Sequence, residues 1–423
     1  MKTVLIVGAG AQGGPCASIL ARDADVETII LGDVNPALLK RVEAKINSPK
    51  ITVMELNAGD PEALRNAARG VDVIINLVLP VFNENIMRTA LETGVHYVDT
   101  SFGEPEMMDL CVRDNILGQI MQGRPLMLDE DFKKAGLTAL VGCGGTPGLI
   151  NVFVRYMSDK LETVDSIRMK FGEGPRPSPD QVPGAWNPGW SPFRALWGFA
   201  VEPAVFTDGR YAIRPIFDAP EVHTFPEPIG SILISRHQHQ EQITLPYFIG
   251  KGVRECEYKY PVDPQAATFV RMGFGNPDPI TVKGTAVSPR DVLLQLTPAP
   301  GNAFLEEDAG GAAAPVVQNQ IWTAEVSGTK DGRSLRYAVT APYTFYWNRT
   351  EKQRIYNTFG AMDIGVALPA VIGAKMCVAG EADPGVIAAE CLDPGIFLQR
   401  IASSGAPLTF HETCTRAVGT VDD

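Results

Sequence analysis

The sequence predicts an α/β protein, with an N-terminal Rossmann domain built on a doubly wound parallel sheet and an inserted, β-rich α+β domain. Three observations lead to this fold class. A buried strand, a glycine loop and a helix open the chain. Strands then alternate with helices as far as about residue 150, which is typical of a parallel sheet. From Val164 onward, short β-like runs are separated by loops rich in glycine and proline.

The first strand, Lys2–Val7, leads directly into a glycine fingerprint of the form G-x-G-x-x-G. The first glycine permits a tight turn, the second lets the backbone approach a pyrophosphate, and the third lets the next helix (15–21) pack close to the strand. The amides at the start of that helix would face the phosphates. A structural glycine turn is the alternative. The residues expected to bind a dinucleotide are Gly8, Gly10, Ala11, Gln12 and Gly13.

An acidic residue, Asp33, follows the second strand and lies twenty residues after Gly13. At this distance a carboxylate can accept hydrogen bonds from the ribose hydroxyls of the cofactor. Its charge would also oppose a 2′-phosphate, so NAD is the preferred cofactor. NADP is the alternative, because Arg41 could reach over to such a phosphate.

The alternation of strands and helices continues up to a sixth strand. Ligands of such sheets bind at the carboxyl ends of the strands, so we expect Asp60, Val78, Pro80 and Thr100 to contact the cofactor. Asp60 fits equally well as the N-cap of the helix that follows it. The predicted helices are 36–46, 61–68, 83–93 and 128–135, and the predicted strands are 26–31, 51–56, 71–77, 95–98 and 137–141.

The segment 142–151 (GCGGTPGLIN) joins the sixth strand to a helix that we expect to reach about residue 161. Four glycines and a proline here indicate a backbone held close to a ligand, either a substrate carboxylate or the nicotinamide amide. We expect Gly145 to contact the cofactor, and Gly144 and Thr146 to contact the substrate. A tight turn between domains is the alternative. Cys143 is interpreted as a small packing residue.

The second domain begins with a strand at 164–171 and a long loop at 172–190 that ends in a dense aromatic stretch. Trp190 could close a cleft and Arg194 could clamp a carboxylate with its planar guanidinium. A proline-rich loop packed on a neighbouring element is the alternative. Further β-like runs are expected at 204–206, 232–235, 242–245, 281–287, 321–327 and 335–341, with a hairpin turn at 330–333.

The densest cluster of ionisable residues is Arg236–Glu241 (RHQHQE). If this segment is extended, His237, His239 and Glu241 lie on one face. Substrate recognition or proton transfer and a solvated strand edge are the two main interpretations. A metal triad is a weaker third one, because the other histidines are dispersed, and we predict no metal site.

Composition limits the remaining classes of function. The 423 residues carry a net charge of −12, which argues against nucleic acid or an anionic membrane as the main partner. The seven cysteines are scattered, which favours reduced thiols and a cytoplasmic location. Met1-Lys2 leads directly into a core strand, so we expect no N-terminal targeting signal. The expected domains are 1–148 for the dinucleotide, 149–355 for substrate and dimerisation, and 356–423, whose helices (358–380 and 393–403) return to the first domain.

Several motifs together resemble the saccharopine dehydrogenase-like reductases, a family that includes carboxynorspermidine dehydrogenase and the saccharopine reductases. The similar motifs, in chain order, are VGAGAQG, GCGGTPGLIN, Trp190-Ser191-Pro192 followed by Asp208-Gly209, Phe225-Pro226 with Gly230, the cluster at 237–241, and ECLDP. The sequence departs from the family in this cluster, where it has HQHQE rather than a single histidine before a glutamate.

The resemblance implies reversible oxidation of a secondary amine derived from an amino acid, or imine reduction in reverse, by a homodimer. For this reaction our hypothesis assigns Arg194 and residues 144–148 to substrate carboxylates, His237 to the substrate, Asp99 or His239 to proton transfer, and Trp190 to closing the cleft. Two alternatives remain, namely aminoalkyl transfer with bound NAD, as in homospermidine synthase, and a non-catalytic NAD-binding sensor.

Overall fold

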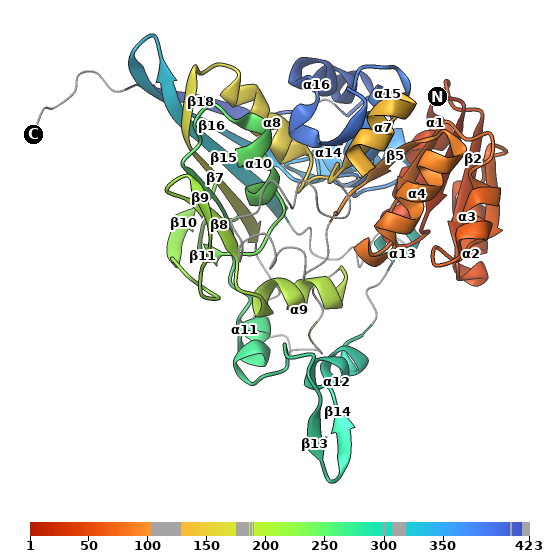
Figure 1. Cartoon of the computed structure of the whole chain (residues 1–423), viewed down its shortest axis with the longest axis horizontal. Coiled ribbons are helices and arrows are strands. Elements are labelled where there is room, and N and C mark those ends of the chain that lie inside the picture. Colours follow the sequence, from red (N-terminus) through yellow and green to blue (C-terminus); the bar gives the residue numbers. More distant parts are fainter. Residues whose placement is uncertain are drawn as a thin grey trace, which may run out of the picture.

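Two β-sheets, connected by helices, form the framework of the chain (Figure 1). The structure is a computed structural model, and it describes residues 1–102, 128–174, 186, 188, 190–298, 302–306, 319–406 and 408–416. None of the described helices combines the length and the apolarity needed to cross a membrane.

The first sheet is wholly parallel and has seven strands within the described residues. Its strand order places the first and fourth strands side by side, which is the switch point where Rossmann folds bind dinucleotides. The predicted fold class is therefore confirmed. Across the sheet the strands are β17 (Gly385–Ala388), β6 (Thr138–Val141), β5 (His96–Asp99), β4 (Val73–Asn76), β1 (Thr3–Val7), β2 (Thr28–Asp33) and β3 (Ile51–Glu55).

Helices cover both faces of this sheet. Val4 and Ile6 of β1 point to one face, and Leu5 and Val7 point to the other, as alternation along a buried strand requires. The first face packs against α1 (Gly13–Arg22), α2 (Pro36–Ile46) and α15 (Ala367–Val378), and the second against α3 (Pro61–Ala67), α4 (Asn83–Thr93) and α7 (Asp129–Ala135). A short 3₁₀ turn, η1 (Pro80–Phe82), precedes α4.

The second sheet is mixed and lies beside the first in Figure 1. Its path runs β10-β11-β12-β7-β15-β16-β18, with β8 paired to β12 and β9 paired to β8. The strands are β7 (Thr163–Gly174), β8 (Ala204–Thr207), β9 (Arg210–Ile213), β10 (Glu221–Thr224), β11 (Ser231–Arg236), β12 (Glu255–Pro261), β15 (Asn319–Lys330), β16 (Arg333–Pro342) and β18 (His411–Arg416).

One continuous apolar core connects the two sheets. Helix α8 (Leu149–Ser158) packs on the inner face of the second sheet, where Phe153 contacts Trp322 with ring centroids 4.9 Å apart. The same core includes most of α15, which lies on the first sheet. The two sheets therefore share one apolar core.

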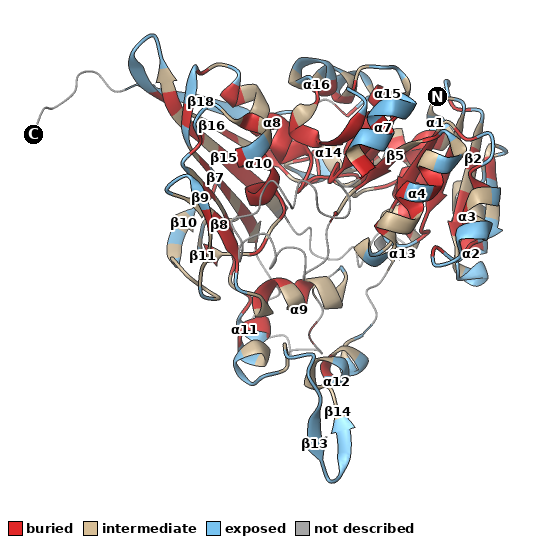
Figure 2. Ribbon diagram, in the orientation of Figure 1, coloured by how far each residue is buried: buried red, intermediate tan, exposed pale blue. Residues whose placement is uncertain are grey.

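A smaller lobe projects away from both sheets and ends in a hairpin that is largely exposed (Figure 2). It contains α9 (Pro192–Ala200), α11 (Pro264–Arg271), β13 (Ile280–Val282), β14 (Thr285–Val287) and α12 (Pro289–Leu296). The remaining elements are α10 (Glu241–Ile249), α13 (Ala303–Glu306), α14 (Arg349–Phe359), η3 (Ala389–Cys391) and α16 (Pro394–Ser403).

Some predicted elements were wrong. Residues 242–245 (QITL), expected as a strand, lie inside α10, because four residues that alternate polar and apolar are too few to distinguish a strand from a helix. The single helix expected at 358–380 is interrupted, since α14 ends at Phe359 with Gly360 in the left-handed region (φ 68°). Strands β17 and β18 were not anticipated. The mixed segment at 104–121 and most of the loop at 172–190 lie outside the described residues.

Candidate functional site

The glycine loop between β1 and α1 has the geometry of a dinucleotide cradle. A Cβ atom on Gly13 would lie 2.0 Å from the carbonyl oxygen of Gly8, so only glycine lets the helix approach the strand this closely. Gly8 itself has a φ of 104°. Gly10, in contrast, has no atom of the described residues, apart from its chain neighbours, within 4 Å of its Cβ position, which leaves its backbone open to a ligand.

Asp33, at the end of β2, is hydrogen-bonded to this loop. Its Oδ2 accepts the Ala9 amide at 2.8 Å, and its Oδ1 accepts the Asn35 amide at 2.9 Å. The buried Oε1 of Gln12 has no partner among the described residues. A carboxylate beside the loop and an unsatisfied acceptor within it both fit the ribose hydroxyls of a dinucleotide, which can donate hydrogen bonds to them.

The other predicted cofactor residues lie at the carboxyl ends of neighbouring strands. Val78 packs directly on Gly8, since a Cβ on that glycine would lie 2.9 Å from Val78 Cγ1. Pro80 opens η1, and Thr100 follows β5. Asp60 accepts the amides of Glu62 and Ala63 at 2.9 and 3.1 Å and therefore is the N-cap of α3. Its contact with the cofactor stays a prediction.

Asp99, proposed for proton transfer, is buried with 1% of its surface exposed. Its Oδ1 accepts the Gly142 amide at 2.8 Å, and its Oδ2 accepts from Tyr97 at 2.9 Å and from Asn83 at 3.2 Å. Burial raises the pKa of Asp99 to about 7. Both oxygens therefore have partners, and the bond to Gly142 connects the end of β5 to the loop after β6. The role of Asp99 as a proton carrier stays a prediction.

The loop 144–148 is closed on itself. The Gly144 amide donates to the Pro147 carbonyl at 2.8 Å, and the amides of Gly148, Leu149 and Ile150 also have partners within the segment 144–151. These are the donors that a carboxylate at the start of α8 would need. Their pairing favours the tight turn, while Gly145 lies against the ring of Tyr343.

The histidine cluster at 237–241 separates into two environments. His237 packs between Phe199 and Tyr260, each with ring centroids 4.9 Å away. Burial and the neighbouring His239 lower its pKa to about 3, so His237 is neutral. Among the described residues, no group of three or more histidine, cysteine or acidic side chains could hold a metal ion.

His239 instead joins a polar group at the junction of the two sheets. Its Nδ1 is hydrogen-bonded to Glu241 Oε2, and Thr146 donates its hydroxyl to the other oxygen of Glu241. Thr146 Oγ1 also lies 3.1 Å from the hydroxyl of Tyr258 in β12. The structure thus unites His239 and Thr146, predicted from separate motifs, and adds Glu241 and Tyr258. The acid at 241 was visible in the cluster, whereas nothing in the sequence marked Tyr258.

The segment next to His239 is anchored to the first sheet. Gln240 is buried, its Oε1 accepts the Phe102 amide at 3.2 Å, and its Nε2 donates to Ser101 Oγ at 3.2 Å and to the Phe102 carbonyl. Since Ser101 and Phe102 follow β5, the cluster faces the carboxyl edge where the cofactor loops lie.

Arg194 and Trp190 lie in the projecting lobe. The Arg194 guanidinium packs over the ring of Trp197, 4.6 Å from its centroid, and burial lowers its pKa. It has no ion-pair partner among the described residues. Trp190 is 45% exposed. No contact joins either residue to His239 in the described part of the chain, so their roles at the substrate stay predictions.

A further buried carboxyl group, Glu390, was not predicted as part of the site. It lies in η3, directly after β17, and its Oε2 accepts from Asn151 Nδ2 at 2.9 Å. It is fully buried, and burial raises its pKa to about 7, with a smaller contribution from the charge of Glu241. Asn151 also accepts the Gly148 amide at 3.0 Å, so Glu390 supports the same loop.

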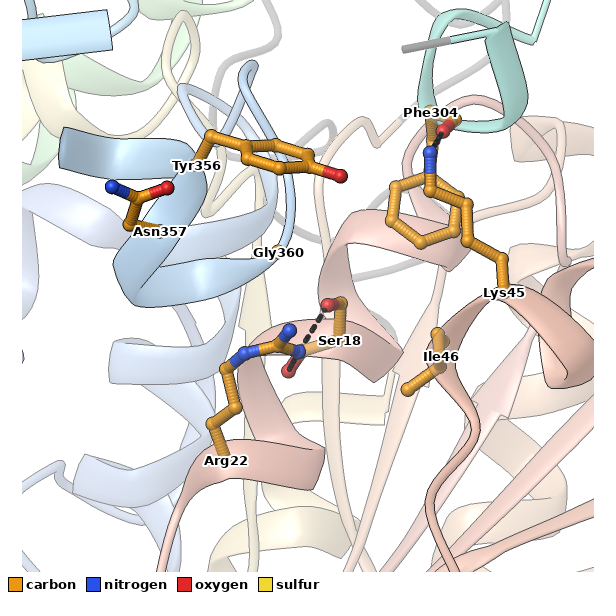
Figure 3. A pocket seen from close by; sticks show the side chains of 8 residues that line it. All are labelled: Ser18, Arg22, Lys45, Ile46, Phe304, Tyr356, Asn357 and Gly360. Atoms are coloured by element: carbon orange, nitrogen blue, oxygen red, sulfur yellow. Dashed lines mark hydrogen bonds between the residues drawn. The ribbon is translucent and has the colours of Figure 1, made fainter. Parts of the chain in front are cut away.

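A cavity of about 290 Å³ lies elsewhere, between α1, α2, α13 and α14 (Figure 3). Arg22 there donates to Ser18 Oγ at 2.7 Å, and Lys45 donates to the carbonyl of Phe304. Lys45 thus joins α2 to α13, Arg22 is engaged within α1, and the glycine loop does not line the cavity. We therefore assign it no part in the candidate site.

Proteins of known family that resemble this chain include a dinucleotide-binding domain, in agreement with the glycine loop described above. Residues 4–140 match the family described as saccharopine dehydrogenase NADP binding domain. The resemblance to saccharopine dehydrogenase-like reductases is confirmed. The chain is 26% identical to carboxynorspermidine synthase of Vibrio cholerae over 95% of each chain. It is 25% identical to carboxyaminopropylagmatine dehydrogenase of Synechocystis, over 97% of this chain and 98% of that one.

Two solved structures share the saccharopine dehydrogenase-like fold. Saccharopine dehydrogenase (L-Glu forming) from Saccharomyces cerevisiae matches with a TM-score of 0.67 and 16% identity, over 98% of this chain and all of that one. Homospermidine synthase from Legionella pneumophila, in complex with NAD, matches with a TM-score of 0.66 and 12% identity, over 97% and 91% of the two chains. At these identities the likeness concerns the fold alone.

The contrast between Gly10 and Gly13 gives a first testable prediction. Gly13→Ala should lower the melting temperature, because its Cβ meets a backbone oxygen, and should also abolish NAD(H) binding. Gly10→Ala should melt like the wild type, because its Cβ enters open space, yet bind NAD(H) at least tenfold more weakly. Thermal melts and calorimetry measure both effects. Unchanged binding by Gly10→Ala would show that no pyrophosphate approaches this loop.

Glu390 gives a second prediction. Its pKa is raised in the folded state, so stability is lost as the pH rises from the unfolded-state value near 4.3 through about 7. Glu390→Gln should therefore be more stable than the wild type at pH 8, by up to about 3 kcal/mol, and show no such gain at pH 4. Denaturant unfolding across this range measures the difference. Glu55→Gln, at an exposed position of β3, is the control and should change stability by less than about 0.5 kcal/mol.

Proposed function

We propose that the protein is an NAD(P)-dependent oxidoreductase that acts on the C–N bond of a secondary amine carrying a carboxylate. In one direction it oxidises the amine, and in the other it reduces the imine formed from an amine and a carbonyl compound. The main support for this proposal is that two parts of the candidate site lie at the same edge of the first sheet. The dinucleotide loop after β1 and the His239 group, attached to the loop after β6, both lie there.

The chemistry divides between the cofactor and the chain. Bound NAD(P) supplies the hydride acceptor or donor at its nicotinamide ring. The glycine loop and Asp33 hold the dinucleotide. His239 moves the proton that the amine nitrogen loses on oxidation or gains on reduction. The apolar core behind both loops fixes their separation, which aligns the reacting carbon with the ring.

The environment of Arg194 favours a substrate that carries a carboxylate. A guanidinium that is partly withdrawn from water gains from an anionic partner, and no carboxylate of the described residues pairs with Arg194. A substrate carboxylate would supply that partner in the bidentate geometry that arginine favours. The names of the two relatives covered almost end to end, carboxynorspermidine synthase and carboxyaminopropylagmatine dehydrogenase, agree with such a substrate.

Turnover of the cofactor tests the proposed function directly. The purified protein should oxidise NADH or NADPH in the presence of an aldehyde that carries an α-amino acid group and a diamine. Asp33 predicts that NADH is preferred. Failure of calorimetry to detect binding of either nucleotide would overturn the proposal.

Arg194→Met gives a third prediction. We expect it to raise KM at least tenfold for the carboxylated substrate, because a charge-assisted pair is lost, and to leave the reaction of a decarboxylated analogue unchanged. Arg271→Met, which removes an exposed guanidinium lying 5.5 Å from the ring of Phe217, is the matched control and should not affect KM. Equal effects on both substrates would contradict the assigned role.

A second candidate function is aminoalkyl transfer with recycled NAD, which the fold shared with the NAD-bound homospermidine synthase supports. The two functions differ in stoichiometry, because transfer leaves no net change in NADH absorbance while product accumulates. Homodimerisation and a cytoplasmic location remain parts of the proposal drawn from the sequence.

A further inference from the structure

Glu241 is a carboxylate from which water is excluded. It is the first residue of α10, none of its surface is exposed, and each oxygen has a different partner. Oε2 is bonded to Nδ1 of His239, and Oε1 accepts the hydroxyl of Thr146. A buried charge is tolerated only where such bonds compensate its lost hydration. This arrangement is therefore a specific one.

The bond to Glu241 determines which nitrogen of His239 carries hydrogen. A carboxylate only accepts hydrogen bonds, so the hydrogen must be on Nδ1. The opposite nitrogen, Nε2, has no partner among the described residues, and the side chain is 21% exposed. The ring is also fixed in direction, because it stacks on Tyr258 at 4.2 Å with an angle of 13° between the planes.

Thr146 connects Glu241 to the loop after β6. Its single hydroxyl hydrogen goes to Glu241, so the Tyr258 hydroxyl is the donor in the 3.1 Å contact between the two oxygens. The order of donation runs from Tyr258 to Thr146 to Glu241, with His239 donating from the other side. The second sheet, the loop of the first sheet and the imidazole are thus held by one carboxylate.

We propose that Glu241 is the positioning residue for proton transfer, fixing the tautomer and the direction of His239 so that Nε2 meets the substrate nitrogen. The proposal rests on the proposed function, in which His239 carries the proton. On oxidation, the C–H hydride goes to the nicotinamide ring and the N–H proton goes to Nε2. Glu241 takes up no proton and stabilises the imidazolium that forms.

An ion pair with only a structural role would also hold these residues together. The test therefore needs a measured quantity that changes only if Glu241 sets the tautomer of His239. The ¹⁵N shifts of histidine report the tautomer without turnover, and His239→Asn assigns the signals. In the wild type, neutral His239 should be almost wholly the Nδ1–H form. In Glu241→Gln, the Nε2–H form should become a major population, because an amide can also donate.

Kinetics provide the second readout. Glu241→Gln should lower kcat about 10²-fold with KM changed less than about threefold, since positioning acts on the proton step and not on binding. Thr146→Val should lower kcat about tenfold and leave NAD(H) binding unchanged. Glu257→Gln is the matched control. Its carboxylate lies in β12 and pairs with Arg236 at 2.7 Å, and its loss should alter neither kcat nor the tautomer.

The outcomes separate the two levels of the proposal. If the wild type turns over no amine, the proposed function fails, while the ¹⁵N shifts still report whether Glu241 sets the tautomer. If Glu241→Gln keeps both the tautomer and kcat of the wild type, Glu241 is structural and the inference is overturned. If that variant does not fold, Thr146→Val decides, and an unchanged kcat with unchanged His239 shifts overturns the inference.

Discussion

Three buried carboxyl groups need hydrogen-bond donors at one edge of the parallel sheet, and the segment 142–151 supplies one donor to each of them. Asp99 accepts the amide of Gly142, Glu241 accepts the hydroxyl of Thr146, and Glu390 accepts the side-chain amide of Asn151. Because an unpaired buried carboxyl is costly, each group constrains where this segment can lie. The shape of the candidate site depends on these bonds more than on any single contact with a ligand.

The same segment connects the two halves of the molecule. Asp99 and Glu390 reach it from β5 and η3 on the first sheet, whereas Glu241 reaches it from α10 beside the second. Gln240 adds a contact with the loop after β5. The segment that carries His239, for which we propose a role in proton transfer, is therefore held against the sheet that carries the glycine loop.

Much of the first domain was predictable because local signals and tertiary packing agree there. Helices α2 and α4 have the bounds expected from their caps and periodicity, and the glycine spacing located the dinucleotide loop. The second domain was less predictable. Residues 242–245 (QITL) alternate polar and apolar side chains as a half-buried strand would, yet they lie in α10 with all four side chains buried. The pairing of Glu241 with Thr146 joins residues 95 positions apart, which no local pattern reveals.

The hydrogen bond from Ala9 to Asp33 has a consequence for how the nucleotide binds. It ties the turn after β1 to the end of β2 by contacts of the chain alone, so the turn is shaped as the protein folds. Conformational freedom that would otherwise be lost on binding has already been given up, and preorganisation of this kind favours tight association. A nucleotide that binds to this turn would therefore lose less binding free energy to the ordering of the loop.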